Sequence, residues 1–163
     1  MPTETTTQTE ACSGPDVQAF RTFMNAHALL VGALESAFAA AELPPLAWHD
    51  VLAVLAEAPE GRMRPHELAD VLVLSRSGLS RLLDRMEAEE VLQRERCPND
   101  RRGTYAVIND TGRDLLARMS PVYRSTVEVH FLPHVGSDAA SVHEALERVA
   151  DSAREACPAD PAA

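Results

Sequence analysis

Residues 75–103 read SRSGLSRLLDRMEAEEVLQRERCPNDRRG, and this stretch decides the fold. Ser75 can cap a helix, and the apolar residues that follow it recur every three or four positions, which predicts an amphipathic helix over 75–90. Two strand-like pieces, 91–96 and 104–108, lie on either side of a turn rich in Pro, Asn, Asp and Gly. We therefore expect a helix followed directly by a hairpin at the centre of the chain.

The predicted helix has two different faces. Its core-facing side is expected to carry Leu79, Leu82, Leu83 and Met86. Its opposite side carries small hydroxyls and charged groups: Ser77, Ser80, Arg81 and Asp84, with Arg76 and Arg85 on the flanks. A DNA major groove accepts such a face, because its side chains can bond base edges or phosphates. An ordinary solvated helix has the same pattern, so the helix alone does not decide the function.

The hairpin favours DNA over that alternative. Arg94 and Arg96 alternate on one predicted strand, and Arg101 and Arg102 lie at its tip. A narrow minor groove concentrates negative potential and attracts an inserted arginine. We interpret Asp100 as a brace that accepts a hydrogen bond from Arg102 and fixes the turn.

The rest of the chain predicts helices around this centre. Their periodic apolar residues and breakers place helices or short pieces at 16–41, 46–57, 62–64 (an extended stub), 65–72, 110–131 and 138–156. The fold class is therefore mainly α with a small β-hairpin wing. We divide the chain into a disordered tail (1–14), an N-terminal dimerisation helix (15–45), a winged helix-turn-helix DNA-binding lobe (46–108), and C-terminal dimerisation helices with a tail (109–163). The apolar stripes of the flanking helices need a cover, and a partner subunit is the simplest one.

The 163 residues suffice for one core, and their charge is unevenly distributed. The net charge is −10, and all 15 cations are arginine. Segment 62–102 holds nine Arg against eight acidic residues, whereas the remainder holds six Arg against seventeen. A local cationic face, and not the total, decides phosphate binding. The chain also lacks an unbroken apolar run of about 18 residues and a secretory signal, so we expect no membrane span. Its three cysteines, in no metal-like spacing, favour a reducing cytoplasm.

The run from Leu72 to Leu116 resembles the MarR family of bacterial transcriptional regulators. The specific pieces are 77–87 (SGLSRLLDRME) and 100–103 (DRRG), with supporting matches at 62–64, 67–69 and 109–112. Two departures are Glu90, where the family usually has Gly, and Asn109, where it usually has Thr. A left-handed conformation at Glu90 costs a residue other than glycine some energy, whereas Asn109 can still cap the next helix.

The resemblance implies an obligate homodimer that binds pseudo-palindromic operators, usually as a repressor released by a small molecule or by oxidation. The residues that we expect at the double-stranded DNA are Arg64, Ser75, Arg76, Ser77, Ser80, Arg81, Arg85, Arg94, Arg96, Arg101 and Arg102. In relatives the effector cavity lies between the long helices and the DNA-binding lobe. By this resemblance His27, Trp48 and His49 would line the effector cavity, which suits a flat aromatic ligand that can also be an anion. Trp48 is equally well explained as a residue of the hydrophobic core.

Other readings remain beside this one. Cys12 lies near the start of the first predicted helix, at approximately the position where peroxide-sensing relatives have a reactive thiol. A redox-sensing regulator is therefore an alternative. A second alternative is a winged-helix module that binds protein and not DNA, although such a surface has no need of Arg101 and Arg102. His130, His134 and His143 suggest a metal only weakly, because Pro133 breaks the helix between the first two. We expect no metal, no cofactor and, in the absence of a catalytic constellation, no enzyme.

Overall fold

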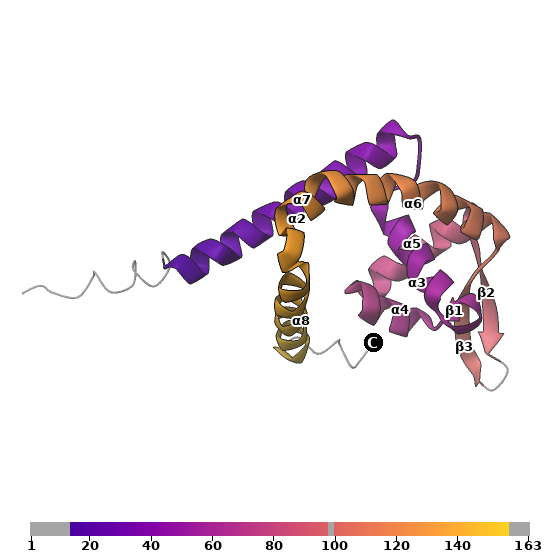
Figure 1. The fold of residues 1–163 in the computed structure, drawn as a ribbon. Coiled ribbons are helices and arrows are strands. Elements are labelled where there is room, and N and C mark those ends of the chain that lie inside the picture. The colour runs from indigo at the N-terminus through magenta and orange to yellow at the C-terminus, as the bar shows by residue number, and fades with distance from the viewer. Residues whose placement is uncertain (1–13, 98–99, 157–163) are drawn as a thin grey trace, which may run out of the picture.

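The computed structural model describes residues 14–97 and 100–156. It is mainly helical, with one small antiparallel sheet (Figure 1). The elements in chain order are α2 (Pro15–Ala40), α3 (Leu46–Glu57), η1 (Pro59–Gly61), β1 (Arg62–Met63), α4 (Pro65–Leu72), α5 (Arg76–Ala88), β2 (Leu92–Cys97), β3 (Asp100–Ile108), α6 (Asp110–His130), α7 (Leu132–Val135), η2 (Gly136–Asp138) and α8 (Ala139–Ala156). The predicted fold class is confirmed, with element ends within a few residues of those expected. The one longer difference is β3, which begins at Asp100 and not at Thr104.

The lobe is built around the buried face of α5. The four predicted core residues, Leu79, Leu82, Leu83 and Met86, are all buried. They join residues of α3, α4 and the sheet in one apolar cluster, which α6 closes through Leu115 and Met119. Burying an apolar side chain of this size contributes about 2 kcal/mol, so this face fixes which side of α5 looks outward.

The sheet has the order β1-β3-β2, so the hairpin β2–β3 is extended by the short strand β1. Leu92 pairs with Ile108 at the base of the hairpin, and Arg96 pairs with Thr104 toward its far end. The register shifts after Arg96, where Cys97 pairs with Asp100. In Figure 1 the hairpin extends from the lobe beyond the end of β1.

The exit of α5 shows how Glu90 replaces the usual glycine. Glu90 takes a left-handed conformation (φ 57°). The Val91 N–H then donates to the Met86 carbonyl and the Glu90 N–H to the Glu87 carbonyl, which closes the helix as in a glycine-ended Schellman motif. The Asn109 side chain donates to the Glu90 carbonyl (2.8 Å), which ties this exit to the start of α6.

Asn109 also begins α6. Its Oδ1 accepts the Gly112 N–H at 2.9 Å, as expected for a cap at this position. Gly112 is required because a Cβ there would lie 2.0 Å from the Val91 carbonyl oxygen. The predicted motif 109–112 therefore holds α6 directly against the end of α5.

The long terminal helices leave much apolar surface uncovered. Among the side chains of α2 that the structure describes, only Leu34 and Phe38 are buried, and Phe20 is 60% exposed. No residue of α8 is buried in the described part of the chain. Figure 1 shows α2 projecting away from the lobe. It also shows α8 descending from beyond α7, at the end of α6 that is farther from the hairpin.

One of these helices bears on the expectation that the chain has no membrane span. By length and composition alone, Val17–Ala40 is long and apolar enough to cross a membrane. Its most apolar stretch has a mean hydropathy of 1.2, and 6% of that stretch is buried. The sequence expectation counted unbroken apolar runs, and Arg21 and Glu35 interrupt such runs in this helix. The mean hydropathy of the helix is high in spite of them. Such a helix is weak evidence of a membrane, because a helix that packs against another protein chain has the same composition.

The turn between α4 and α5 generates a prediction about stability. Val73 has φ 54° and is 76% exposed, so a β-branched residue is held in a left-handed conformation without packing in return. Val73→Gly should raise the free energy of unfolding by about 0.5–1 kcal/mol, because the relief of strain exceeds the entropy that glycine adds to the unfolded chain. Chemical denaturation measures this difference. The matched control is Val71→Gly within α4, which should lower the same free energy by a similar amount. A loss of stability from both changes would contradict the account of the turn.

Candidate nucleic-acid interface

The outward face of α5 carries the residues predicted for it. Ser77, Ser80, Arg81 and Arg85 are exposed, as are Arg76 at the start of the helix and Asp84. The face therefore combines two hydroxyls with three arginines over about three turns. Small side chains between long cations let a helix approach a groove closely while arginines reach its floor and walls.

Ser75 has a local role in this arrangement. Its Oγ accepts a hydrogen bond from the Gly78 N–H (3.1 Å), which caps α5. Arg64 stands at the equivalent position before α4, where its backbone N–H donates to the Glu67 carboxylate (3.1 Å). Both predicted contact residues thus fix the start of a helix.

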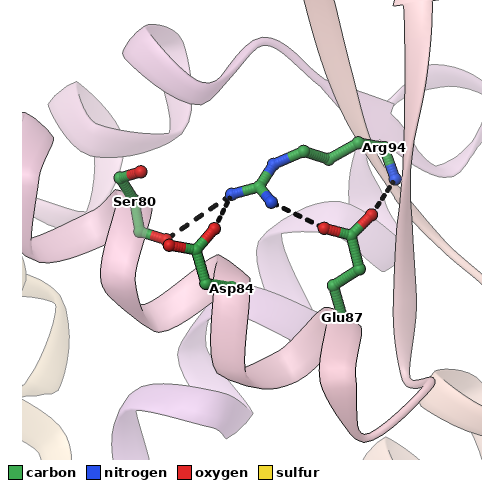
Figure 2. A network of polar contacts seen from close by, with 4 residues as sticks. All are labelled: Ser80, Asp84, Glu87 and Arg94. Carbon is green, nitrogen blue, oxygen red and sulfur yellow. Dashed lines mark hydrogen bonds and ion pairs between the residues drawn. The ribbon is translucent and has the colours of Figure 1, made fainter.

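Arg94 joins the hairpin to α5 (Figure 2). Its guanidinium donates from Nη1 to Glu87 at 2.6 Å and from Nη2 to Asp84 at 2.7 Å, with a longer contact of 3.5 Å to the Ser80 carbonyl. The Arg94 backbone N–H also donates to Glu87 (3.1 Å). We call this set of contacts the Arg94 bridge. It connects β2 with two successive turns of α5.

The electrostatics of the Arg94 bridge keep its cation in place. Burial alone lowers the pKa of Arg94, but the hydrogen bond to Asp84 and the charges of Glu87 and Asp84 raise it on balance. The Arg94 side chain is 26% exposed and points to α5. The structure therefore gives Arg94 a positioning role toward α5, and the DNA contact expected from sequence stays a prediction.

The remaining hairpin cations are placed only in part. Arg96 is exposed on β2. The side chains of Asp100, Arg101 and Arg102 lie outside the described residues, and so does the predicted brace between Asp100 and Arg102. Their backbones form the first part of β3.

A cationic hollow of about 360 Å³ lies between α5, the start of α4 and β3. Its walls include Arg64, Arg76, Ser80 and Arg94. Arg64 and Arg62 also approach the ring of Tyr105, with guanidinium carbons 5.7 and 5.1 Å from the ring centre. Attraction to the ring holds these cations beside the sheet. Because the guanidinium of Arg94 is bonded to α5, it is Arg64 and Arg76 in these walls that suit a phosphate passing between helix and hairpin.

The three predicted effector residues do not meet in one cavity. His27 lines a hollow between α2, α3 and α6, which we call the α2–α3–α6 hollow. Trp48 is buried in the core. His49 lines a different hollow, on the other side of Tyr123. Leu46 and Asp50, four positions apart on α3, face the hollow that His27 lines, whereas Trp48 and His49 lie on other faces of the same helix.

Sequence reasoning missed Asp50 and Tyr123. The rings of His49 and Tyr123 stack with centres 4.3 Å apart and planes 8° apart, and Asp50 lies 3.3 Å from His49 Nδ1. The pKa of Tyr123 is raised, first by burial and then by the charge of Asp50. No sequence signal links Asp50 to Tyr123, because they lie on different helices 73 positions apart.

The other candidate ligands are also placed. His130 and His134 line an apolar groove against α2. Within residues 14–97 and 100–156, no group of three or more His, Cys, Asp or Glu is arranged to hold a metal ion. Cys97 is a buried free thiol, whereas Cys12 and Cys157 lie outside the described residues.

A helix-turn-helix with a hairpin wing, exposed arginines and a cationic hollow defines a winged-helix DNA-binding protein. The MarR family model matches residues 43–103. AbsC, a MarR family transcriptional regulator from Streptomyces coelicolor, is 30% identical, with a TM-score of 0.79 over 94% of this chain and 99% of that one. The chain therefore belongs to the MarR family of transcriptional regulators, which are not enzymes.

Two further solved structures extend the comparison. Sco3205, a MarR family regulator from the same organism crystallised in complex with DNA, is 27% identical, with a TM-score of 0.81 over 91% of this chain and 93% of that one. PcaV from S. coelicolor, in complex with its natural ligand, shares the fold at 23% identity, with a TM-score of 0.67 over 94% and 99%. No curated protein matches the chain.

The Arg94 bridge yields a prediction that separates positioning from phosphate contact. Arg94→Gln should lower the free energy of unfolding by about 1–2 kcal/mol, because Asp84 and Glu87 lose their shared cation. It should weaken binding to every DNA sequence while leaving the slope of log affinity against log salt unchanged, because no phosphate contact is lost.

Arg96→Gln, at an exposed position two residues further along the same strand, is the matched control. It should leave stability nearly unchanged and reduce the salt slope by about one. Salt titrations of DNA binding measure both slopes. A reduced slope for Arg94→Gln would show that this side chain contacts phosphate after all.

Proposed function

We propose that the protein is a homodimeric transcriptional regulator that binds a pseudo-palindromic operator and acts as a repressor that a small molecule releases. The observation that carries the DNA part is the exposed face of α5, which presents Ser77, Ser80 and Arg81 and is held to the wing by Arg94. In this proposal α5 enters the major groove, and the wing arginines Arg101 and Arg102 follow the adjacent minor groove.

The remaining residues predicted at the DNA have different roles in the proposal. Arg76 and Arg85 flank the reading face, and Arg96 lies on the exposed strand, so all three suit phosphates. Arg64 suits the same partner, because it lines the cationic hollow. Ser75 acts through the helix that it caps, whose first N–H groups point toward the DNA.

Uncovered apolar surface supports the dimer. Phe20, Met24 and Leu29 on α2 are 60%, 46% and 74% exposed, and Val149 on α8 is 56% exposed. A single chain leaves these side chains in water, and a soluble monomer rarely exposes so large an apolar area. A two-fold interface formed by α2, α6 and α8 covers them and spaces two α5 helices for consecutive grooves.

The uneven charge supports selective binding. Segment 62–102 is close to neutral with nine arginines, whereas the flanking chain carries a large negative excess. The flanks repel DNA at long range, so binding should depend on the contacts that a correct site provides and should fall steeply with salt.

The α2–α3–α6 hollow supports release by a ligand. A molecule between the long helices and the lobe changes the spacing of the two α5 helices, and only its differential affinity for the two spacings shifts the equilibrium. A hundredfold difference contributes about 2.7 kcal/mol, enough for release. PcaV, crystallised with its natural ligand, gives a precedent for a ligand on this fold. A regulator of this kind acts in the cytoplasm, beside the chromosome.

The dimer proposal predicts weaker dimerisation from one exposed change. At micromolar concentration the wild-type chain should sediment as a dimer, and Phe20→Glu should raise the dimer dissociation constant at least about tenfold, because a charge enters the apolar interface. Val71→Glu, at an exposed apolar position of the lobe, is the control and should leave the dimer intact. A wild-type monomer under these conditions would overturn the proposal.

The DNA proposal is tested by selecting operators from random sequences. The selected sites should be inverted repeats with half-sites about one helical turn, roughly 10–10.5 base pairs, apart. Arg81→Ala should cost about 1–3 kcal/mol on the selected site and relax the preference at one base position. Arg102→Ala should weaken all sequences alike and reduce the salt slope. Selected sites without a dyad, or equal losses on specific and random DNA for Arg81→Ala, would refute the proposed docking.

A further inference from the structure

The α2–α3–α6 hollow is a cavity of about 360 Å³, which is within the range of small-molecule sites. Its walls are mostly apolar and come from three helices and the residue after α6: Leu30, Val31, Leu34, Leu46, Val127 and Phe131. Apolar walls of this size exclude water from a flat hydrophobic molecule such as a bicyclic aromatic ring.

Its polar groups are few, and most are already fixed. The Thr126 hydroxyl donates to the Val122 carbonyl (3.0 Å), so toward a ligand it can act as an acceptor. The Tyr123 ring is held parallel to His49 at 4.3 Å. A prearranged pocket loses little entropy when a ligand enters, and the face of a tyrosine ring attracts cations.

Its charge has one sign. With histidine counted as neutral, Asp50 is the one charged residue that lines this hollow in the described part of the chain. All 15 cations of the chain are arginines, and none of the described ones lines it. Asp50 and Tyr123 line the same hollow, and the pKa of Tyr123 is raised first by burial and then by the charge of Asp50. An aromatic carboxylate that enters would face Asp50 without an arginine among the described lining residues to offset it.

We infer that the α2–α3–α6 hollow binds a positively charged aromatic molecule, such as a protonated arylalkylamine, with the Asp50 carboxylate as its counter-ion. The inference rests on the proposed function only for the consequence of binding, which is release of the operator. It replaces the anionic aromatic ligand expected from sequence, because that expectation relied on His27 and His49 lining one cavity, and they line two.

The test compares two matched probes, 2-naphthylmethylamine and 2-naphthoate, at neutral pH by calorimetry without DNA. The full chain should bind the protonated amine at least about tenfold more tightly than the carboxylate. Asp50→Asn keeps an oxygen for His49 and removes the charge, so it should abolish the preference. Asp50→Glu keeps the charge and should retain the preference, which guards against a loss caused only by misfolding.

Glu57→Gln is the matched control, because Glu57 is an exposed carboxylate of the neighbouring hollow that contains His49. It should leave the preference unchanged. Equal affinity for both probes, tighter binding of naphthoate, no binding of either probe, or a preference that survives Asp50→Asn would overturn the inference.

Operator binding of the same proteins separates this inference from the proposed function. A chain that selects an inverted repeat but prefers naphthoate would leave the proposed function intact and contradict the inference. A chain that binds the amine through Asp50 but selects no operator would contradict the proposed function and support the inference.

Discussion

The Arg94 bridge is the contact on which the rest of the interface depends. One guanidinium on β2 joins two carboxylates, Asp84 and Glu87, that lie one turn apart on α5. α5 presents Ser80 and Arg81 to solvent, and the hairpin presents Arg96. The distance between these two groups of side chains therefore depends on how the Arg94 bridge holds the hairpin against α5. Because Arg94 offsets part of the charge of two acidic groups beside that face, it also reduces the repulsion that a phosphate backbone would meet there.

The rest of the molecule relates to this centre through two ties. Gly112 lets α6 approach Val91 at the exit of α5, and Asn109 bonds the Glu90 carbonyl, so the long helix continues rigidly from the lobe. The same helix lines the α2–α3–α6 hollow through Tyr123 and Val127. In the proposed dimer, a ligand in that hollow therefore acts on α6 and changes the direction of a lobe to which α6 is directly attached.

Local patterns in the sequence predict most of the fold. The spacing of Leu79, Leu82, Leu83 and Met86 is sufficient to orient α5, and Ser75 and Asn109 cap helices as their side chains allow. The candidate site is less predictable, because its contacts join distant positions. Arg94 bonds residues seven and ten positions earlier, and a strand pattern alone does not tell whether it faces the helix or solvent. Asp50 meets Tyr123 only through packing of α3 on α6, and Trp48 is turned into the core by the same packing.

The central claim is that the Arg94 bridge orients the hairpin for DNA binding. A double-mutant cycle with Arg94→Gln, Glu87→Gln and the double variant tests it most directly when the measured quantity is the free energy of binding to the selected operator. The account predicts strong non-additivity, with a coupling energy of about 1–2 kcal/mol, because either single change breaks the same bridge. Additive losses would contradict it and would mean that Arg94 and Glu87 affect DNA binding independently.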